Sequence, residues 1–248
     1  GDTQLDLPAG CRGDDDLIHP SGLGDLDGDG REDLGIACFD SGAFGVGGAR
    51  RGGVAIYWGR AAPWPVGPLA PDVVLLGEDP VESGGSFSAG ERVGRSVVAL
   101  GDVDGDGFDD LLVTGEQLVD TEQSIAWLFR GGSDARTTLQ STSGAAWTIS
   151  GAADVRCLEP IEASALGDVD GGGLPDFALI CPQQPLPIPG SQNAVDIDFS
   201  VFFGETLAAG ASAALGFDDR AFLVNLLAAQ SPRALVGAAV GNLDGAPG

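Results

Sequence analysis

Short apolar runs rich in valine, isoleucine, phenylalanine and tryptophan recur along the chain, and glycine or a polar loop ends each one. Runs of this length and composition favour β-strands over helices. They fall into three similar sets, at 33–38, 53–59 and 72–77, at 110–114, 124–131 and 146–151, and at 176–181, 199–204 and 221–227. Because another apolar run at 95–101 precedes the second set, the pattern predicts four short strands in each repeating unit.

An acidic, glycine-rich motif separates the first strand of each unit from the second. The sequence reads Leu-Gly-Asp-Leu-Asp-Gly-Asp-Gly at 23–30, and close copies follow at 100–107 and 166–173. A shorter fourth copy at 240–245 has Asn242 in place of the first aspartate. Tandem units of four strands are typical of propeller blades. A parallel β-helix would need a shorter period, and an array of separate sandwich modules would need linkers, which do not stand out.

The predicted fold class is therefore all-β, a β-propeller of four-stranded blades. Its predicted divisions are 1–10 (the last strand of a preceding blade), 11–80, 81–153, 154–230 and 231–248 (the first strand of a truncated blade). Three complete blades and two partial ones lead us to expect a segment of a larger propeller.

Alternate residues of each acidic motif carry oxygen atoms that could face one cation. Calcium prefers six to eight oxygen ligands, and the glycines of the motif permit a tight loop. In the first loop, 25–33, the predicted ligands are Asp25, Asp27, Asp29, Asp33 and the backbone carbonyl of Arg31. In the second, 102–110, they are Asp102, Asp104, Asp106, Asp110 and the carbonyl of Phe108.

The third loop, 168–176, is incomplete because Gly172 replaces the aspartate of position 5. Its predicted ligands are Asp168, Asp170, Asp176 and the carbonyl of Leu174, with water in the gap and weaker binding. An EF-hand is excluded, since it needs a glutamate at position 12 between flanking helices, and position 12 falls within a predicted strand in every copy. The remaining alternative is an acidic surface turn without metal.

Residues 94–111 read Gly-x-Ser-Val-x-x-x-Gly-Asp-Val-Asp-Gly-Asp-Gly-x-x-Asp-Leu. This pattern resembles the FG-GAP repeat of integrin α-subunit propellers and their bacterial relatives, although Arg92-Val-Gly94 stands where Phe-Gly is expected. The resemblance implies a seven-bladed propeller with Ca²⁺ loops on one face. It also implies a secreted or surface-displayed protein that acts in adhesion or ligand binding.

The four cysteines occupy matching places in the first and third units. Cys38 and Cys181 each lie the same distance after the first aspartate of their loop, and Cys11 and Cys157 precede it. Among three possible pairings, we predict Cys11–Cys38 and Cys157–Cys181. Disulfides favour an oxidising compartment, which agrees with an extracellular or cell-surface location.

Composition narrows the function further. The chain of 248 residues has 37 acidic and 12 basic side chains, a net charge of −25, and no lysine. This charge argues against nucleic acid as a partner, because nucleic acid needs a basic surface. No apolar run is long enough for a membrane span. Without lysine and with one histidine, Walker A loops and HExxH zinc sites are excluded.

The sequence leaves three functions open. The first is a non-enzymatic, calcium-binding propeller segment that binds a protein or glycan ligand through loops such as 40–52 and 182–197. The second is the non-catalytic part of a secreted polysaccharide-acting enzyme, and the third is a structural spacer. No pair of carboxylates stands out as catalytic beyond the predicted calcium ligands, so we expect no enzymatic activity. The expected partners are the ligand and the rest of the parent propeller.

Overall fold

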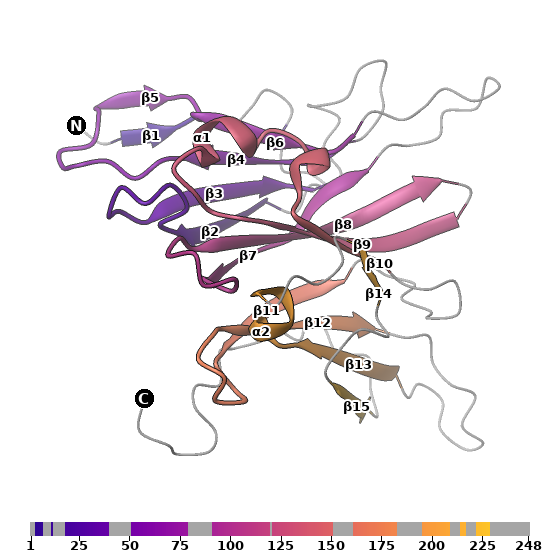
Figure 1. Ribbon diagram of the computed structural model, residues 1–248. Coiled ribbons are helices and arrows are strands. Elements are labelled where there is room, and N and C mark those ends of the chain that lie inside the picture. Colours follow the sequence, from indigo (N-terminus) through magenta and orange to yellow (C-terminus); the bar gives the residue numbers. More distant parts are fainter. Residues whose placement is uncertain are drawn as a thin grey trace.

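The computed structural model describes residues 3–6, 11, 18–39, 51–78, 91–119, 121–150, 161–182, 195–208, 214–216 and 222–228. Three antiparallel units of four strands dominate these residues (Figure 1). The first unit contains β2 (Ile18–Gly24), β3 (Asp33–Cys38), β4 (Gly53–Tyr57) and β6 (Val73–Leu76). The second contains β7 (Arg92–Gly101), β8 (Asp110–Val119), β9 (Thr121–Phe129) and β10 (Trp147–Ser150). The third contains β11 (Glu162–Gly167), β12 (Asp176–Pro182), β13 (Val195–Phe202) and β15 (Phe222–Ala228).

The strands of each unit pair with their neighbours in chain order, so every unit is a meander. The short elements β1 (Thr3–Leu5), β5 (Gly67–Leu69) and β14 (Ala214–Gly216) lie outside the meanders. Three short helical turns follow the third strands of the second and third units, namely α1 (Ala135–Thr138), η2 (Thr142–Gly144) and α2 (Gly204–Ala208). An all-β fold was predicted; the described residues are mostly β, with three short helical turns, and the predicted four-stranded units are confirmed. Closure into a wheel is not observed in the described residues.

The second unit packs between the other two units (Figure 1), and the alternation of side chains along its strands explains why. From β8, Leu111 and Val113 join a buried cluster with Val54 and Ile56 of the first unit. The intervening Leu112 joins a second cluster, which includes residues of the third unit. Burying one such side chain stabilises the fold by roughly 1.5–3 kcal/mol. Both faces of the second sheet are therefore core.

The connection between the third and fourth strand of each unit runs parallel to the last strand of the unit before it. In the third unit β14 pairs with β10, and in the second Ser141 forms a parallel bridge with Leu76 at the end of β6. In the first unit β5 pairs in the same sense with β1. Against the first unit, β1 thus takes the place that β6 and β10 take against the second and third.

The outer face of the first sheet is also apolar. Ile36, Ala55 and Tyr57 form a third buried cluster, and Leu5 of β1 and Leu69 of β5 pack against it. The Tyr57 hydroxyl donates a hydrogen bond of 2.6 Å to the carbonyl of Asp6. The short β1–β5 pair therefore covers the outer face of the first sheet. In the second sheet, the equivalent face, with Leu111 and Val113, packs on the first sheet.

One part of the strand prediction is wrong. The polar stretch 115–123 was expected to be a loop, but β8 and β9 continue through it as a paired hairpin. Backbone pairing does not require apolar side chains, and the Arg92 guanidinium holds Glu116 at 3.1 Å on the neighbouring strand. The predicted divisions at 10/11, 80/81, 153/154 and 230/231 involve residues outside the described ranges, as does the whole of 231–248.

Candidate metal centres

The three acidic loops join the first and second strands of their units. They therefore lie at the same end of each sheet, between β2 and β3, β7 and β8, and β11 and β12 (Figure 1). Each loop turns through two glycines with a positive φ, for example Gly28 at 73° and Gly30 at 82° in the first. Glycine adopts this region readily because it has no Cβ. The same two positions have a positive φ in the other loops, at Gly105, Gly107, Gly171 and Gly173.

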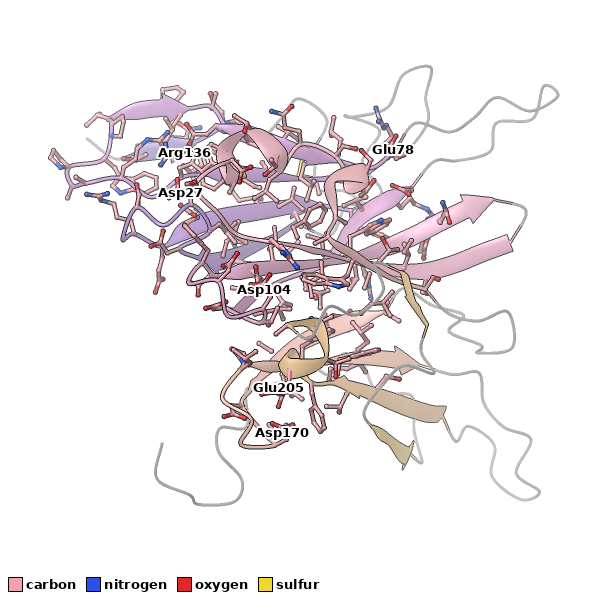
Figure 2. The ribbon with its side chains drawn as sticks, viewed as in Figure 1. Asp27, Glu78, Asp104, Arg136, Asp170 and Glu205 are labelled. Atoms are coloured by element: carbon pink, nitrogen blue, oxygen red, sulfur yellow. A yellow bond between two sulfur atoms is a disulfide. The ribbon has the colours of Figure 1, made fainter. Side chains whose placement is uncertain are left out.

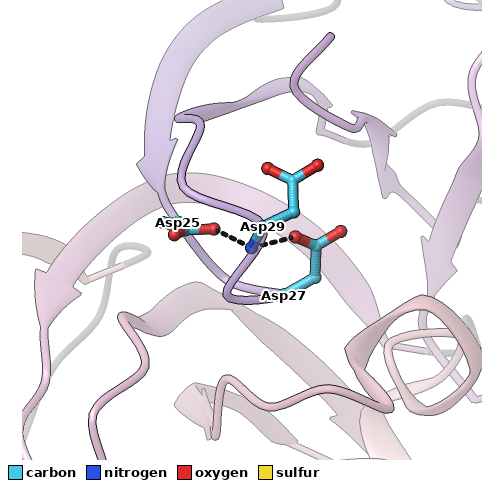
Figure 3. A group of neighbouring side chains, drawn as sticks. All are labelled: Asp25, Asp27 and Asp29. Carbon is cyan, nitrogen blue, oxygen red and sulfur yellow. Dashed lines mark hydrogen bonds between the residues drawn. The ribbon is translucent and has the colours of Figure 1, made fainter.

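The aspartate at position 1 holds the loop backbone around its carboxylate. Asp25 accepts hydrogen bonds from the N–H groups of Asp29 at 3.0 Å and Gly30 at 2.8 Å. Figure 3 shows the carboxylates of Asp25 and Asp27 on either side of the Asp29 backbone nitrogen, which donates to both. Asp102 accepts the same two bonds, from the N–H groups of Asp106 and Gly107, whereas Asp168 accepts from those of Gly171 and Gly173. The hydrogen bonds within the motif therefore hold its carboxylate oxygens close together.

The aspartate at position 9 is a buried link between the loop and the sheet. In the second loop, Asp110 accepts from the N–H of Val103 at 2.9 Å and from that of Gly131, beyond β9, at 2.9 Å. Asp33 in the first loop and Asp176 in the third make the same two bonds. All three side chains are buried. The link repeats in every unit, so it is part of the repeat itself.

Burial changes the proton affinity of these position-9 carboxylates. Desolvation raises the pKa of Asp110 to about 7 and that of Asp33 to about 6, although backbone N–H donors oppose the change. Desolvation also raises the pKa of Asp176. A buried carboxylate that is ionised at neutral pH costs free energy unless it takes up a proton or lies near a cation.

Each loop brings three carboxylates together, with ligand atoms that all lie within 4.8 Å of one another. The groups are Asp25, Asp27 and Asp29, then Asp102, Asp104 and Asp110, then Asp168, Asp170 and Asp176. Of the predicted carboxylate ligands, Asp33 lies outside the first group and Asp106 outside the second. Such oxygen-only groups fit a hard divalent cation such as calcium.

Two of the three residues predicted to offer a carbonyl at position 7, Phe108 and Leu174, use their side chains to join neighbouring loops. A Cβ on Gly28 would lie 2.3 Å from the Phe108 ring, so the aromatic side chain of the second loop rests on the first. Leu174 of the third loop approaches Gly105 of the second in the same way. Asp109 reinforces the first contact by accepting a hydrogen bond of 2.8 Å from the N–H of Asp25. Arg31 instead pairs with Asp29 at 3.2 Å.

Two arginines that were not predicted as site residues hold the aspartates of position 3. Arg136 of α1 donates to Asp27 of the first loop, and Figure 2 shows the two side chains side by side. Arg130, which follows β9, lies 2.9 Å from Asp104 of the second loop. Each guanidinium also stacks on a tryptophan, Arg136 on Trp58 and Arg130 on Trp147. No sequence signal marks these two arginines, because they lie outside the acidic motifs, after β9 and in α1.

The disulfide prediction is confirmed for the first pair. Cys11 and Cys38 are bonded, with Cα atoms 5.6 Å apart. The second predicted pair lies outside the described residues, because Cys157 and the side chain of Cys181 are not described. Trp58, Trp127 and Trp147 are buried in the core. In the described part of the chain, no helix has both the length and the apolarity to cross a membrane.

Comparison with known families identifies one part of the chain. The family model of the FG-GAP repeat matches residues 93–129, which include most of β7, the second acidic loop, β8 and β9. A search of curated proteins finds no significant relative. The matched segment contains a complete copy of the acidic motif, and the four-stranded units on either side repeat the two hydrogen bonds of its position-9 aspartate. Residues 93–129 are therefore an FG-GAP repeat, as the resemblance of 94–111 implied.

Proposed function

We propose that the chain is a calcium-stabilised segment of an extracellular β-propeller. The observation that carries this proposal is the threefold recurrence of one acidic loop, at the same place in three adjoining four-stranded units. The predicted ligands supply carboxylate oxygens to each cation, and a bound cation would offset their mutual repulsion. Because the loops touch one another through Phe108 and Leu174, ordering one loop also supports its neighbour.

A propeller is supported by how the units follow one another. The same face of each sheet meets the sheet before it, and the same connection pairs with the strand before it. A rule that repeats between units can extend to further units. In this arrangement the outer face of the first sheet, with Ile36 and Tyr57, receives the preceding blade, and β1 is that blade's last strand.

The metal role can be tested by thermal unfolding in excess Ca²⁺, in Mg²⁺ and in EGTA. A cation that binds only the folded state adds about 2.7 kcal/mol per site when present at one hundred times its Kd. We expect a large rise in melting temperature with Ca²⁺ and a smaller one with Mg²⁺, which demands stricter octahedral geometry. Equal melting temperatures in Ca²⁺ and EGTA would contradict the proposal.

A matched variant separates binding at the loops from a general effect of salt. The aspartates of position 3 accept few backbone bonds, so Asp27→Asn, Asp104→Asn and Asp170→Asn together remove ligand charge while leaving the loop backbone supported. This triple variant should lose most of the calcium response. The control Asp134→Asn changes an exposed aspartate beside α1 and should respond like the original chain.

The proposed biological role is non-enzymatic binding of a protein or glycan ligand at the propeller loops. The candidate binding loops 40–52 and 182–197 lie mostly outside the described residues. Arg51, at the end of the first loop, donates two hydrogen bonds to the carbonyl of Gly77 and so anchors that loop to the sheet. Binding to a glycan array, without shortening of soluble polysaccharides, is the expected result. Shortening of a polysaccharide would instead favour the enzyme alternative.

A further inference from the structure

The third acidic loop lacks the aspartate of position 5, and a glutamate from another element takes its place. Glu205 is the second residue of α2, which begins at Gly204, just after β13. A Cβ built on Gly172 would lie 1.9 Å from Oε1 of Glu205 and 2.8 Å from Oε2. The carboxylate of Glu205 therefore fills the space that a side chain at position 5 would occupy. Figure 2 shows Glu205 above the loop that carries Asp170.

Glu205 also makes the hydrogen bond of the missing aspartate. In the second loop, Oδ1 of Asp106 at position 5 accepts from the N–H of Phe108 at 3.0 Å. In the third loop, the equivalent N–H of Leu174 donates to Oε1 of Glu205 at 3.3 Å. The same backbone donor thus finds a carboxylate in both loops, from position 5 in one and from α2 in the other.

The second oxygen of Glu205 has no partner. Oε2 is buried, and no hydrogen-bond donor in the described residues reaches it. Burying a charged oxygen without a partner is costly, and a cation bound in the third loop would supply that partner. The first and second loops each have an arginine on their position-3 aspartate. Among the described residues, no basic side chain pairs with the carboxylates of the third loop.

The backbone around Glu205 is fixed from both sides, so its side chain is held at the loop. The N–H of Gly204 donates 3.0 Å to Asp176, the buried aspartate of position 9. A Cβ on Gly204 would come within 2.5 Å of the Pro175 carbonyl, which shows how closely α2 approaches the loop. Leu207, one turn further on, is buried in the core between the second and third units.

We infer that Glu205 is a ligand of the third cation site, replacing the position-5 aspartate that Gly172 removes. The inference rests on the proposed calcium binding and corrects one part of the sequence prediction, in which water filled this gap. The ligands of this site are then Asp168, Asp170, Asp176, Glu205 and the carbonyl of Leu174. With a full set of carboxylates, the third loop binds calcium as a complete site rather than a weakened one.

The test is the number of Ca²⁺ ions bound per chain, measured by isothermal titration on the full chain and on Glu205→Gln. The original chain should bind three ions. Removing one ligand charge weakens a calcium site, so Glu205→Gln should bind two tightly and the third about tenfold or more weakly. The control Glu78→Gln removes an exposed glutamate that lies far from the three loops (Figure 2) and should still bind three.

A second variant moves the carboxylate back into the loop. Gly172 has no positive φ, and the three atoms nearest to a Cβ added there all belong to Glu205. Glu205→Ala should lose the third ion, and Gly172→Asp combined with Glu205→Ala should regain it. This rescue guards against a single variant that simply misfolds, since the double variant must then bind and melt like the original chain.

The outcomes separate the two proposals. If the original chain binds no Ca²⁺, the proposed function fails, and this inference fails with it. If the original chain binds Ca²⁺ but Glu205→Gln binds the same number with unchanged affinity, only the role of Glu205 is overturned. If the combined Gly172→Asp and Glu205→Ala variant folds but does not regain the third ion, the equivalence of the two positions is overturned as well.

Discussion

At the scale of single residues, the buried aspartate of position 9 connects each acidic loop to its sheet by hydrogen bonds. In each loop its two oxygens accept one N–H from the loop and one from a glycine just beyond the third strand. It thereby fixes the loop to the sheet whether or not a cation is present. The cost is desolvation, which raises the pKa of Asp110 to about 7 and that of Asp33 to about 6.

The raised pKa values predict how stability depends on pH without calcium. Between pH 4 and 7 the folded chain holds protons on Asp110 and Asp33 that the unfolded chain has released, so the free energy of unfolding falls as pH rises. Each tenfold difference in proton affinity is worth about 1.4 kcal/mol. In EGTA, the melting temperature should therefore be higher at pH 5 than at pH 7.

The variant Asp110→Asn tests whether Asp110 causes this pH dependence of the melting temperature. The amide cannot titrate, so the difference in melting temperature between pH 5 and pH 7 should shrink, whereas Asp134→Asn should leave it unchanged. Protons and Ca²⁺ compete for the same carboxylates, so calcium affinity should rise over the same pH range. A melting temperature in EGTA that climbs from pH 5 to pH 7 would rule out this role for Asp110.

At the scale of elements, each acidic loop supports the next. Phe108 of the second loop covers Gly28 of the first, and Leu174 of the third lies beside Gly105 of the second. Position 7 was predicted as a source of a backbone carbonyl alone. Its side chain could not be assigned a role from the sequence, because the partner glycine belongs to a different unit.

A pair of glycine variants isolates this contact. Gly30→Ala meets open space and should cost only the penalty of a left-handed backbone, about 1–2 kcal/mol. Gly28→Ala carries the same penalty and also forces a methyl group into the Phe108 ring, which should add about 1–3 kcal/mol. Chemical unfolding measures both. If Phe108→Ala does not reduce the extra cost of Gly28→Ala, the two loops are not coupled in this way.

The Cys11–Cys38 disulfide ties the segment before β2 to the end of β3. Its sequence separation is 27 residues, and a loop of this size should contribute about 3 kcal/mol to the free energy of unfolding. Replacing both cysteines with serine should lower the denaturant midpoint accordingly. Calcium stoichiometry serves as the control and should stay the same, because Cys38 lies at the end of β3 away from the acidic loop.

At the scale of the whole molecule, the three units are copies that stack face to face. The order of strands and the register of the acidic loops follow from local spacing, which is why the sequence predicted them. Three residues reach the loops from later segments, namely Arg130, Arg136 and Glu205. Their positions depend on how the connection between the third and fourth strand of a unit folds. The repeat pattern carries no information about such long-range contacts, so none of these three residues could be predicted from the sequence.

The apolar outer face of the first sheet gives a prediction at this scale. Removing residues 1–6 takes away β1 and uncovers Ile36, Leu69 and Tyr57. The shortened chain should melt at a lower temperature and bind more of a hydrophobic dye such as ANS. The control Tyr57→Phe loses only the hydrogen bond to Asp6 and should bind no more dye than the original chain. Equal dye binding by the shortened and full chains would show that β1 does not cover this face.

The central claim is that each unit places a calcium ion in its acidic loop. Its most direct test is an anomalous difference map from a crystal of this chain grown with Ca²⁺, recorded at a wavelength where calcium scatters anomalously. The map should show three peaks, inside the loops at 25–33, 102–110 and 168–176, with the third peak also in contact with Glu205. Well-ordered loops without any such peak would contradict the claim.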